Sequence, residues 1–315
     1  MGSPRTRTVR RTEQRNPRSP GLDQLSTREL VRALHCEDAT VARAVGRELP
    51  AIARAVDAIV RSLRGGGRLI YAGAGTSGRL AALDAAECPP TFGVAARQVQ
   101  AILAGGRRAL TAAVEGAEDS AARGERDLAA RQVTRRDAVV GLTASGTTPY
   151  VLAALRLARR RGAVTIGVTA NRHSPIARIA DIIIAPNTGP ELIAGSTRMK
   201  AGTAQKMVLN TLSTAAFVRL GRVYNNWMVD VALTNRKLRE RGRRILQEAS
   251  GASKSRAARA LAQSRGKMRV ALVMLKTGAG VAEARRRLRQ GGGELRRALS
   301  ETSPARTSGK AFAKK

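Results

Sequence analysis

Five short apolar runs, separated by turn residues and helical segments, constrain the fold of this chain more than any other feature of its sequence. Each run holds about five consecutive residues rich in Val, Ile and Leu, which is typical of strands buried on both faces of a parallel sheet. The segments between them, such as "TPYVLAALRLARRRG" (148–162), have the length and apolar spacing of helices. We therefore predict an α/β fold built on a doubly wound, mainly parallel, five-stranded sheet. The predicted strands lie in "RLIYAG" (68–73), "VQAILAG" (99–105), "DAVVGLTAS" (137–145), "AVTIGVTA" (163–170) and "ADIIIAP" (180–186).

Helical patterns flank this alternating region on both sides. Apolar residues recur every three or four positions from "LSTRELVRAL" to "AIVRSLRGGG", and again from "GSTRMKAGTAQK" to "RRILQEASG", which indicates amphipathic helices. Gly251 is typical of a helix C-cap and marks a boundary, after which we expect a bundle of short helices. The predicted organisation is a basic disordered or extended arm (1–24), the sheet domain with its N-terminal helices (25–250), a small helical module (251–300) and a basic tail (301–315).

The charged and aromatic residues restrict the partners that this chain can have. The 315 residues carry a formal net charge of +34, but Arg and Lys are spread along the chain and only 2% of the residues are aromatic. Stacking on single-stranded nucleic acid needs aromatic side chains, so we expect any binding of nucleic acid to be non-specific. Two cysteines and two histidines provide no cluster with the composition of a zinc site, and we expect neither a metal nor a cofactor.

The termini and the cysteines indicate the compartment. The N-terminus is rich in arginine but lacks the apolar core of a signal peptide, and no apolar run approaches membrane-spanning length. Cys36 and Cys88 provide no disulfide framework and suit a reducing environment. Cys88 is interpreted as a packing residue, since no base is placed to activate it. We predict a cytoplasmic protein without a membrane partner.

The first predicted strand runs into "GAGTSG", which matches the G-x-G-x-x-G pattern of dinucleotide-binding loops. A dinucleotide site also needs an acidic residue near the end of the next strand, to hold the ribose hydroxyls. That strand, in "RQVQAILAGG", offers Gln98, Gln100 and glycines but no acid. The sequence therefore disfavours a nicotinamide cofactor.

Hydroxyl side chains follow the first and third predicted strands instead. Thr76 and Ser77 stand beside the first amides of a helix, where N–H donors and the positive end of the helix dipole attract anions. The carboxyl ends of parallel strands share an edge, so the two loops should converge on one phosphate monoester. The alternative is that each hydroxyl only caps its own helix. The other candidate ligands of the phosphate or sugar are Thr143, Ser145, Thr147 and Thr148 after the third strand, and Ser196, Thr197, Arg198 and Lys200 in "GSTRMKAGT".

These paired hydroxyl loops resemble the sugar isomerase (SIS) domain, which binds phosphosugars. Six longer motifs give a narrower resemblance, to the N-acetylmuramic acid (MurNAc) 6-phosphate etherases, and it extends over nearly the whole chain. Two of them, "ECPPTFG" and "GSTRMKAGTAQK", are long and unusual enough to be highly specific. The motifs are "GAGTSGRL", "DAAECPPTFG", "AVEGAEDS", "ASGTTPYV", "GSTRMKAGTAQK" and "MVDVALTN".

The resemblance implies an activity and an assembly. The family cleaves the D-lactyl ether of MurNAc 6-phosphate, giving N-acetylglucosamine (GlcNAc) 6-phosphate and D-lactate in the recycling of cell-wall amino sugars. It implies a homodimer, no metal and a UBA-like helical module at the C-terminus. The catalytic acid of "ECPPTFG" corresponds to Glu87, and its partner in "GAED" corresponds to Glu118. The chain departs from the family at Thr147, where arginine is frequent, at Asn225, where glycine is frequent, and in its more basic charge.

Such a cleavage needs two carboxyl groups in different protonation states. The open-chain aldehyde acidifies the proton on C2, so one carboxylate removes it while an acid protonates the departing lactyl oxygen, and water then adds to the unsaturated aldehyde. Glu87 stands just before a double proline, so we expect it at the end of a helix that stops there. Glu118 is expected at the start of a helix, with Glu115 as its rival for the role of base.

Two other functions use the same kind of phosphate site. An aldose–ketose isomerase shares the hydroxyl loops and one glutamate base but does not need the second acid. A non-catalytic phosphosugar sensor, like the glucokinase regulatory protein that resembles this family, keeps the loops and can lose both acids. The presence of both Glu87 and Glu118 favours the enzyme.

Overall fold

The computed structural model describes residues 11–231, 233 and 235–300, and its centre is the predicted parallel sheet. The strand order is β2-β1-β3-β4-β5, and Leu69 of β1 lies opposite Val99 of β2 and Ala138 of β3. This order places the first strand beside both the second and the third, so the loops after β1 and β3 leave one edge as neighbours. The α/β fold and the five strands are confirmed. The strands are β1 (Leu69–Gly73), β2 (Val99–Leu103), β3 (Ala138–Leu142), β4 (Val164–Val168) and β5 (Ile182–Ile184).

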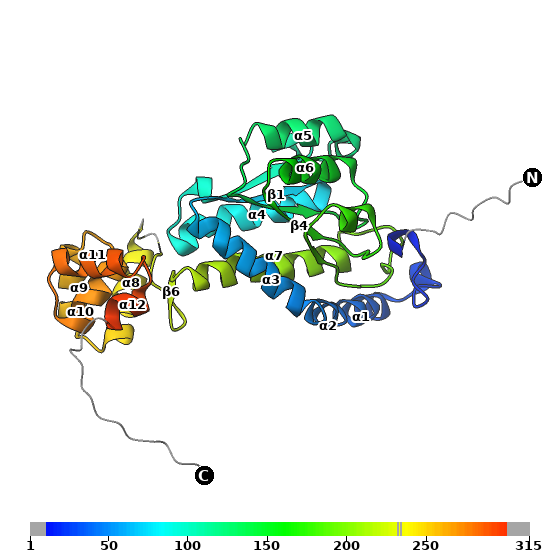
Figure 1. Cartoon of the computed structure of the whole chain (residues 1–315). Helices are drawn as coiled ribbons and strands as arrows, with labels where there is room; N and C mark the ends of the chain where they lie inside the picture. The colour runs from blue at the N-terminus through cyan, green and yellow to red at the C-terminus, as the bar shows by residue number, and fades with distance from the viewer. Residues whose placement is uncertain (1–10, 232, 234, 301–315) are drawn as a thin grey trace, which may run out of the picture. The chain divides into compact units, whose positions relative to one another are not determined.

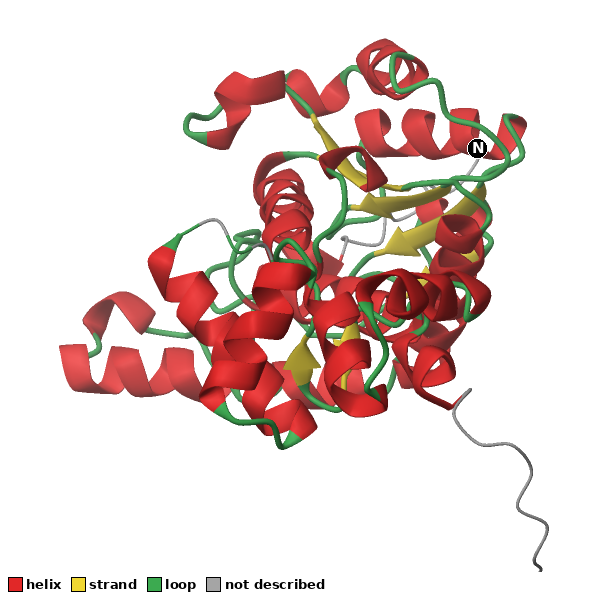
Figure 2. Ribbon diagram, turned by 90° about the vertical axis from the view of Figure 1, so that its left-hand side faces the viewer, coloured by secondary structure: helices red, strands yellow, loops and turns green. Residues whose placement is uncertain are grey.

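Helices cover both faces of this sheet, as the ribbon views show (Figures 1 and 2). Successive strand residues face opposite ways. Ile70 of β1 packs in one core with apolar residues of α5 and α6, whereas the Tyr71 hydroxyl donates a 2.7 Å hydrogen bond to Asp84 on α4. Asp84 also accepts a 3.0 Å bond from Ser213 on α7, so α4 and α7 lie on the second face. The helices are α3 (Leu49–Arg64), α4 (Gly75–Phe92), α5 (Ala121–Ala129), α6 (Pro149–Arg160) and α7 (Lys200–Arg219).

The segment before the first long helices is packed rather than extended. The short turns η1 (Arg11–Glu13) and η2 (Leu22–Gln24) lead into α1 (Thr27–Asp38) and α2 (Val41–Gly46). Asn16 is buried, and its side-chain amide donates hydrogen bonds to Glu37 at 2.7 Å and to the carbonyl of Pro190 at 3.1 Å. These bonds hold part of the predicted arm against the sheet domain. Residues 1–10 of that arm, and the predicted tail 301–315, lie outside the described residues.

Helix α4 does not stop at the double proline. It continues through Pro89 and Pro90 to Phe92, although each proline removes one helical hydrogen bond. Burial of Phe92, whose ring stacks on Phe217 with centroids 4.7 Å apart, offsets that loss. The helix ends at Gly93, with φ of +62°, where a Cβ would stand 2.2 Å from the carbonyl oxygen of Asp230. The expected stop before the prolines is wrong, and Glu87 lies inside the helix.

The described residues from Phe217 to Ser300, together with residues 90–93, form a second compact unit. Its core contains Leu246, Leu261 and Leu272, so α8 packs with the helices that follow it. Gly251 has the left-handed C-cap conformation predicted for it, but the helix that it ends, α8, belongs to this second unit and not to the sheet domain. The elements are β6 (Val223–Tyr224), β7 (Trp227–Met228), α8 (Arg236–Ser250), α9 (Lys254–Gln263), α10 (Met268–Thr277), α11 (Val281–Gln290) and α12 (Leu295–Ser300).

Asn225 occupies the turn of the small hairpin between β6 and β7. Its φ of +52° is a left-handed conformation that glycine adopts freely and that asparagine tolerates better than most residues. Its side-chain oxygen accepts a 2.8 Å hydrogen bond from Arg296. The turn itself therefore accommodates asparagine at this position.

Across the described part of the chain, no helix combines the length and the apolar character that crossing a bilayer demands.

Candidate active site

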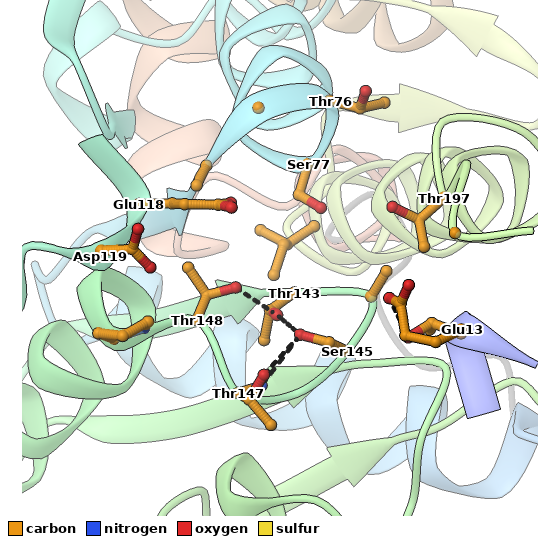
Figure 3. A pocket seen from close by; sticks show the side chains of 17 residues that line it. Glu13, Thr76, Ser77, Glu118, Asp119, Thr143, Ser145, Thr147, Thr148 and Thr197 are labelled. Atoms are coloured by element: carbon orange, nitrogen blue, oxygen red, sulfur yellow. Dashed lines mark hydrogen bonds between the residues drawn. The ribbon is translucent and has the colours of Figure 1, made fainter. Parts of the chain in front are cut away.

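A cavity of about 410 Å³ opens at the carboxyl edge of β1 and β3 (Figure 3). The loop after β1 forms one wall and the loop after β3 another, as predicted for a doubly wound sheet. Residues 195 and 197 before α7, the turn η5 (Ala117–Asp119) and the N-terminal turn η1 complete the lining. The polar side chains on the wall are Thr12, Glu13, Thr76, Ser77, Glu118, Asp119, Thr143, Ser145, Thr147, Thr148 and Thr197.

The glycines of the first loop bring the start of α4 against the strand. A Cβ on Gly73 would lie 2.7 Å from the Gly78 nitrogen, and a Cβ on Gly78 would lie 2.1 Å from Leu103. Only glycine permits this approach, so the G-x-G-x-x-G pattern is explained by packing rather than by a dinucleotide. The turn leaves Thr76 and Ser77 in the first turn of α4, at the cavity. An anion there meets the positive end of the helix dipole.

The loop after β3 presents a chain of linked hydroxyl groups. Thr143 bonds to Thr148 at 2.7 Å and to Ser145 at 3.3 Å, and Ser145 bonds to Thr147 at 2.9 Å. Helix α6 begins just after Thr148, but the Thr148 side chain forms no capping bond to that helix. Gly146 permits the turn, because a Cβ there would stand 1.9 Å from the Ser174 hydroxyl. The hydroxyls are therefore positioned by one another, and helix capping does not explain Thr148.

Three carboxylates line the same cavity. Glu118 and Asp119 come from η5, and Glu13 faces them from the opposite side (Figure 3). Glu118 lines the cavity together with Ser77, whereas its rival Glu115 does not. Helix α5 begins only after Ser120, so Glu118 occupies a short turn before the helix instead of its first turn. No Lys or Arg belongs to the lining among the described residues. The site is rich in hydroxyls and acids.

The structure does not bring every predicted residue to this cavity. Glu87 is exposed on α4, ten residues beyond Ser77, which is roughly 15 Å along a helix axis. Ser196 is partly buried but is not part of the lining. Lys200 is buried and forms an ion pair with Glu37, at the start of α7. Arg198 is exposed and is likewise not part of the lining. The predicted residues that the cavity unites are Thr76, Ser77, Thr143, Ser145, Thr147, Thr148, Thr197 and Glu118.

Glu13 and Asp119 are lining residues that the sequence analysis missed. Asp119 follows Glu118 directly in "GAED" and could have been proposed with it. Glu13 belongs to the N-terminal segment, which reaches the cavity through a long-range contact: the Gly195 amide donates to the Thr12 carbonyl at 3.1 Å. No local pattern encodes that contact. Its only trace in the sequence is the polar but not purely basic stretch "TEQRNP".

A buried polar cluster links β1, α4 and α7. Burial raises the pKa of the Asp84 carboxyl, although hydrogen bonds from Tyr71 and Ser213 act in the opposite direction. Burial, with the neighbouring Asp84 carboxylate, raises the pKa of the Cys88 thiol to about 12. Cys88 is therefore a protonated thiol at neutral pH and not a nucleophile. This agrees with its interpretation as a packing residue.

The fold has relatives among proteins that handle sugar phosphates. The profile of the glucokinase regulatory protein N-terminal SIS domain matches residues 51–159. A phosphoheptose isomerase from Francisella tularensis superposes with a TM-score of 0.50 at 19% identity, covering 62% of this chain and 100% of that one. At this identity the superposition shows the fold alone. The sheet and its two hydroxyl loops thus define the class of protein, which is an SIS-domain protein.

Closer relatives give the particular family. An N-acetylmuramic acid 6-phosphate etherase of Geobacillus thermodenitrificans is 51% identical over 288 residues, covering 91% of this chain and 98% of that protein. The protein of the same name from Serratia proteamaculans is 54% identical over 289 residues, covering 92% and 97%. The chain belongs to the N-acetylmuramic acid 6-phosphate etherase family.

Proposed function

We propose that this protein cleaves the D-lactyl ether of MurNAc 6-phosphate, giving GlcNAc 6-phosphate and D-lactate. Membership of the etherase family supports the substrate. The single observation that carries the proposal is the meeting of the two hydroxyl loops with Glu118 in one cavity. The volume of about 410 Å³ suits a phosphorylated amino sugar.

The hydroxyl loops are the proposed phosphate site. Ser77 offers a hydroxyl in the first turn of α4, and Ser145 offers a second one from the β3 loop. Without a lysine or arginine in the described lining, the phosphate depends on hydroxyl donors, helix N-terminal amides and the helix dipoles. This arrangement fits Thr147 standing where arginine is frequent in the family.

The proposed chemistry is an elimination followed by hydration, which makes the enzyme a carbon–oxygen lyase. Glu118 takes the C2 proton of the open-chain sugar, the C3–O bond breaks, and a protonated carboxyl group supplies the proton that leaves with D-lactate. Water then adds across the double bond, with its hydroxyl at C3 and a proton at C2. The bond from the lactyl carbon to its oxygen stays intact throughout. Each proton transfer uses a carboxyl group of matched protonation state.

Glu87 remains the proposed acid for the lactyl oxygen and then base for the water, on the strength of the family motif. Glu87 lies outside the cavity of its own chain, so the proposed role requires that it acts in the cavity of another molecule. We therefore propose a homodimer in which Glu87 of one chain serves the cavity of its partner. A cytoplasmic location, as predicted from the sequence, completes the proposal.

Purified protein incubated with MurNAc 6-phosphate tests the activity. We expect D-lactate and GlcNAc 6-phosphate in equal amounts, and their loss in Glu118→Gln. Glucose 6-phosphate and fructose 6-phosphate, offered under the same conditions, should not interconvert. Lactate at background level with tight binding of the phosphosugar would favour the sensor, and interconversion of the hexose phosphates would favour an isomerase.

A further inference from the structure

A second cavity, of about 430 Å³, lies in the same unit and has the opposite charge. Arg18, Arg43 and Arg47 line it, together with the buried Lys200, and Glu37 is the one acid of its described wall. The first cavity has three acids and no base among its described lining residues. Basic residues are common in this chain, but they are not distributed evenly between these two cavities. We name the second one the basic cavity.

The positive charge of this wall is only partly neutralised. Glu37 and Lys200 form a buried ion pair, and Glu37 also accepts from Arg18 at 3.2 Å and from Asn16 at 2.7 Å. Burial alone would raise the pKa of Glu37, but these hydrogen bonds and positive charges outweigh the effect of burial and lower the pKa. The Glu37 carboxylate is therefore already bonded within the protein. Arg43 lies on the short helix α2, and Arg47, four positions later, is the C-cap residue of that helix. They add two cations with exposed guanidinium groups.

A buried hydroxyl group in the wall lacks a partner. Thr188 is 6% exposed, and its Oγ1 has no hydrogen-bond partner among the described residues. A buried unpaired hydroxyl is costly, and a native structure that retains one usually satisfies it with a water, an ion or a ligand. Thr188 belongs to the loop 187–190, which lines the basic cavity. Glu37 is the one carboxylate among the described lining residues of that cavity. The hydroxyl can donate to an acceptor that enters there.

We propose that the basic cavity binds a small anion that carries a phosphate group. The guanidinium groups of Arg43 and Arg47 match the oxygens of a phosphate. Arg18 adds a third guanidinium group, and the Thr188 hydroxyl supplies a neutral donor. The volume admits a phosphate monoester of the size of a sugar phosphate. This proposal does not depend on the proposed etherase activity, because none of its ligands lines the first cavity.

Two segments of the chain run through both cavity walls. Thr12 and Glu13 line the first cavity and Asn16 and Arg18 the basic one, and the stretch from Thr197 to Lys200 divides in the same way. An anion that holds Arg18 in place therefore also restricts the motion of the N-terminal segment that carries Glu13. Coupling between two binding sites is reciprocal: a ligand in the first cavity changes the affinity of the basic cavity by the same factor as the anion changes the affinity of the first. The basic cavity would thus act as a regulatory site.

Titration with inorganic phosphate tests the site. In the Ser77→Ala/Ser145→Ala background, where the first cavity is weakened, wild-type arginines should still bind one phosphate at constant ionic strength. Arg43→Gln/Arg47→Gln should weaken that binding by about tenfold for each arginine. The control Arg28→Gln/Arg32→Gln removes two exposed arginines with the same spacing on α1, outside the cavity. Equal binding in the two arginine variants would overturn the proposal, since phosphate would then be responding only to net charge.

Two further measurements distinguish a specific phosphate site from general attraction of phosphate to a basic surface. Thr188→Val keeps the side-chain shape and should lower the affinity for phosphate while leaving the phosphate-free Tm unchanged or higher. Hydrogen exchange at the Gly195 amide, which bonds to Thr12, should slow on adding phosphate in the serine background and stay unchanged with Arg43→Gln/Arg47→Gln. Unaltered phosphate affinity in Thr188→Val would contradict the site as drawn.

Discussion

At the scale of single residues, the cavity assigns different tasks to its hydroxyls and its acids. Ser77 and Ser145 stand where helix amides and hydroxyl donors meet, so we propose that they bind the phosphate charge that is present in the ground state. Glu118 faces the same space and is the proposed acceptor of the C2 proton. In this proposal the phosphate holds the sugar, and the carboxylate acts on it. The two groups of residues should therefore separate in kinetics.

Ser77→Ala and Ser145→Ala should weaken binding of MurNAc 6-phosphate more than they slow its cleavage. Each removes a hydrogen bond to a charged group, worth roughly 1.5–3 kcal/mol. The measurement is the dissociation constant, by calorimetry, beside kcat. Ser196→Ala is the matched control, because Ser196 lies outside the lining. If the control weakens binding as much as the two cavity variants do, the phosphate site lies elsewhere.

Glu118→Gln should lose both cleavage and exchange of the C2 proton with solvent, while it still binds the phosphosugar. Glu87→Gln should retain C2 exchange in unreacted substrate and lower lactate release by roughly 10²–10⁴. Both are measured by NMR in heavy water. Glu115→Gln serves as the control and should behave as wild type, since Glu115 does not line the cavity. Loss of exchange in Glu115→Gln alone would mean that the base was assigned to the wrong glutamate.

At the scale of elements, a buried polar network fastens the N-terminal segment to α1 and α7. Glu37 of α1 pairs with Lys200 of α7 and accepts from Asn16. All three side chains are buried, so each depends on the others for its partners. Removing one member leaves an uncompensated charge or donor in the interior, which is far more costly than losing a surface pair.

Glu37→Gln should destabilise the sheet domain by about 3–5 kcal/mol at neutral pH, since Lys200 is left without its counter-ion. The lowered pKa of Glu37 stabilises the native state above the ordinary carboxyl pKa, and this stabilisation is lost as pH falls through the lowered value. The difference from wild type should thus shrink below about pH 4. Thermal unfolding between pH 3 and 7 measures it. Glu125→Gln breaks the exposed pair with Arg160 and should cost less than about 1 kcal/mol; equal losses in the two variants would refute the network.

The sequence predicted those elements whose signals are local, and it was wrong or silent where long-range packing decides. Apolar runs identified all five strands, and the loop hydroxyls after β1 and β3 indicated the cavity. The helix through Pro89 and Pro90 could not be foreseen, because burial of Phe92 decides it. Glu13 reaches the cavity only through contacts nearly 200 residues away in the chain. Lys200 has the composition of a phosphate ligand, but its partner is a carboxylate of α1.

At the scale of the whole molecule, the two proposed catalytic glutamates require two chains. Glu118 lines the cavity of its own chain and Glu87 does not. A homodimer with twofold symmetry would give each cavity one residue from either chain. Such shared sites can be tested without knowing the interface.

Mixed dimers of Glu87→Gln and Glu118→Gln should recover activity that neither parent has. In a mixed dimer one cavity receives both native glutamates and the other receives neither, so random mixing should restore about a quarter of wild-type activity. Co-refolding the two variants and assaying lactate measures this. Mixing Glu118→Gln with Glu118→Ala is the control and should stay inactive. Persistent inactivity of a properly formed mixed dimer would mean that Glu87 does not serve the partner's cavity.

The most direct test of the central claim follows wild-type protein acting on MurNAc 6-phosphate in heavy water. Elimination and hydration at the cavity predict one D-lactate for each GlcNAc 6-phosphate, with deuterium at C2 of the sugar and none on the carbons of lactate. Proton and carbon NMR read both positions in one sample. Lactate released from a sugar that keeps its original C2 proton would contradict the mechanism, and no lactate at all would contradict the function.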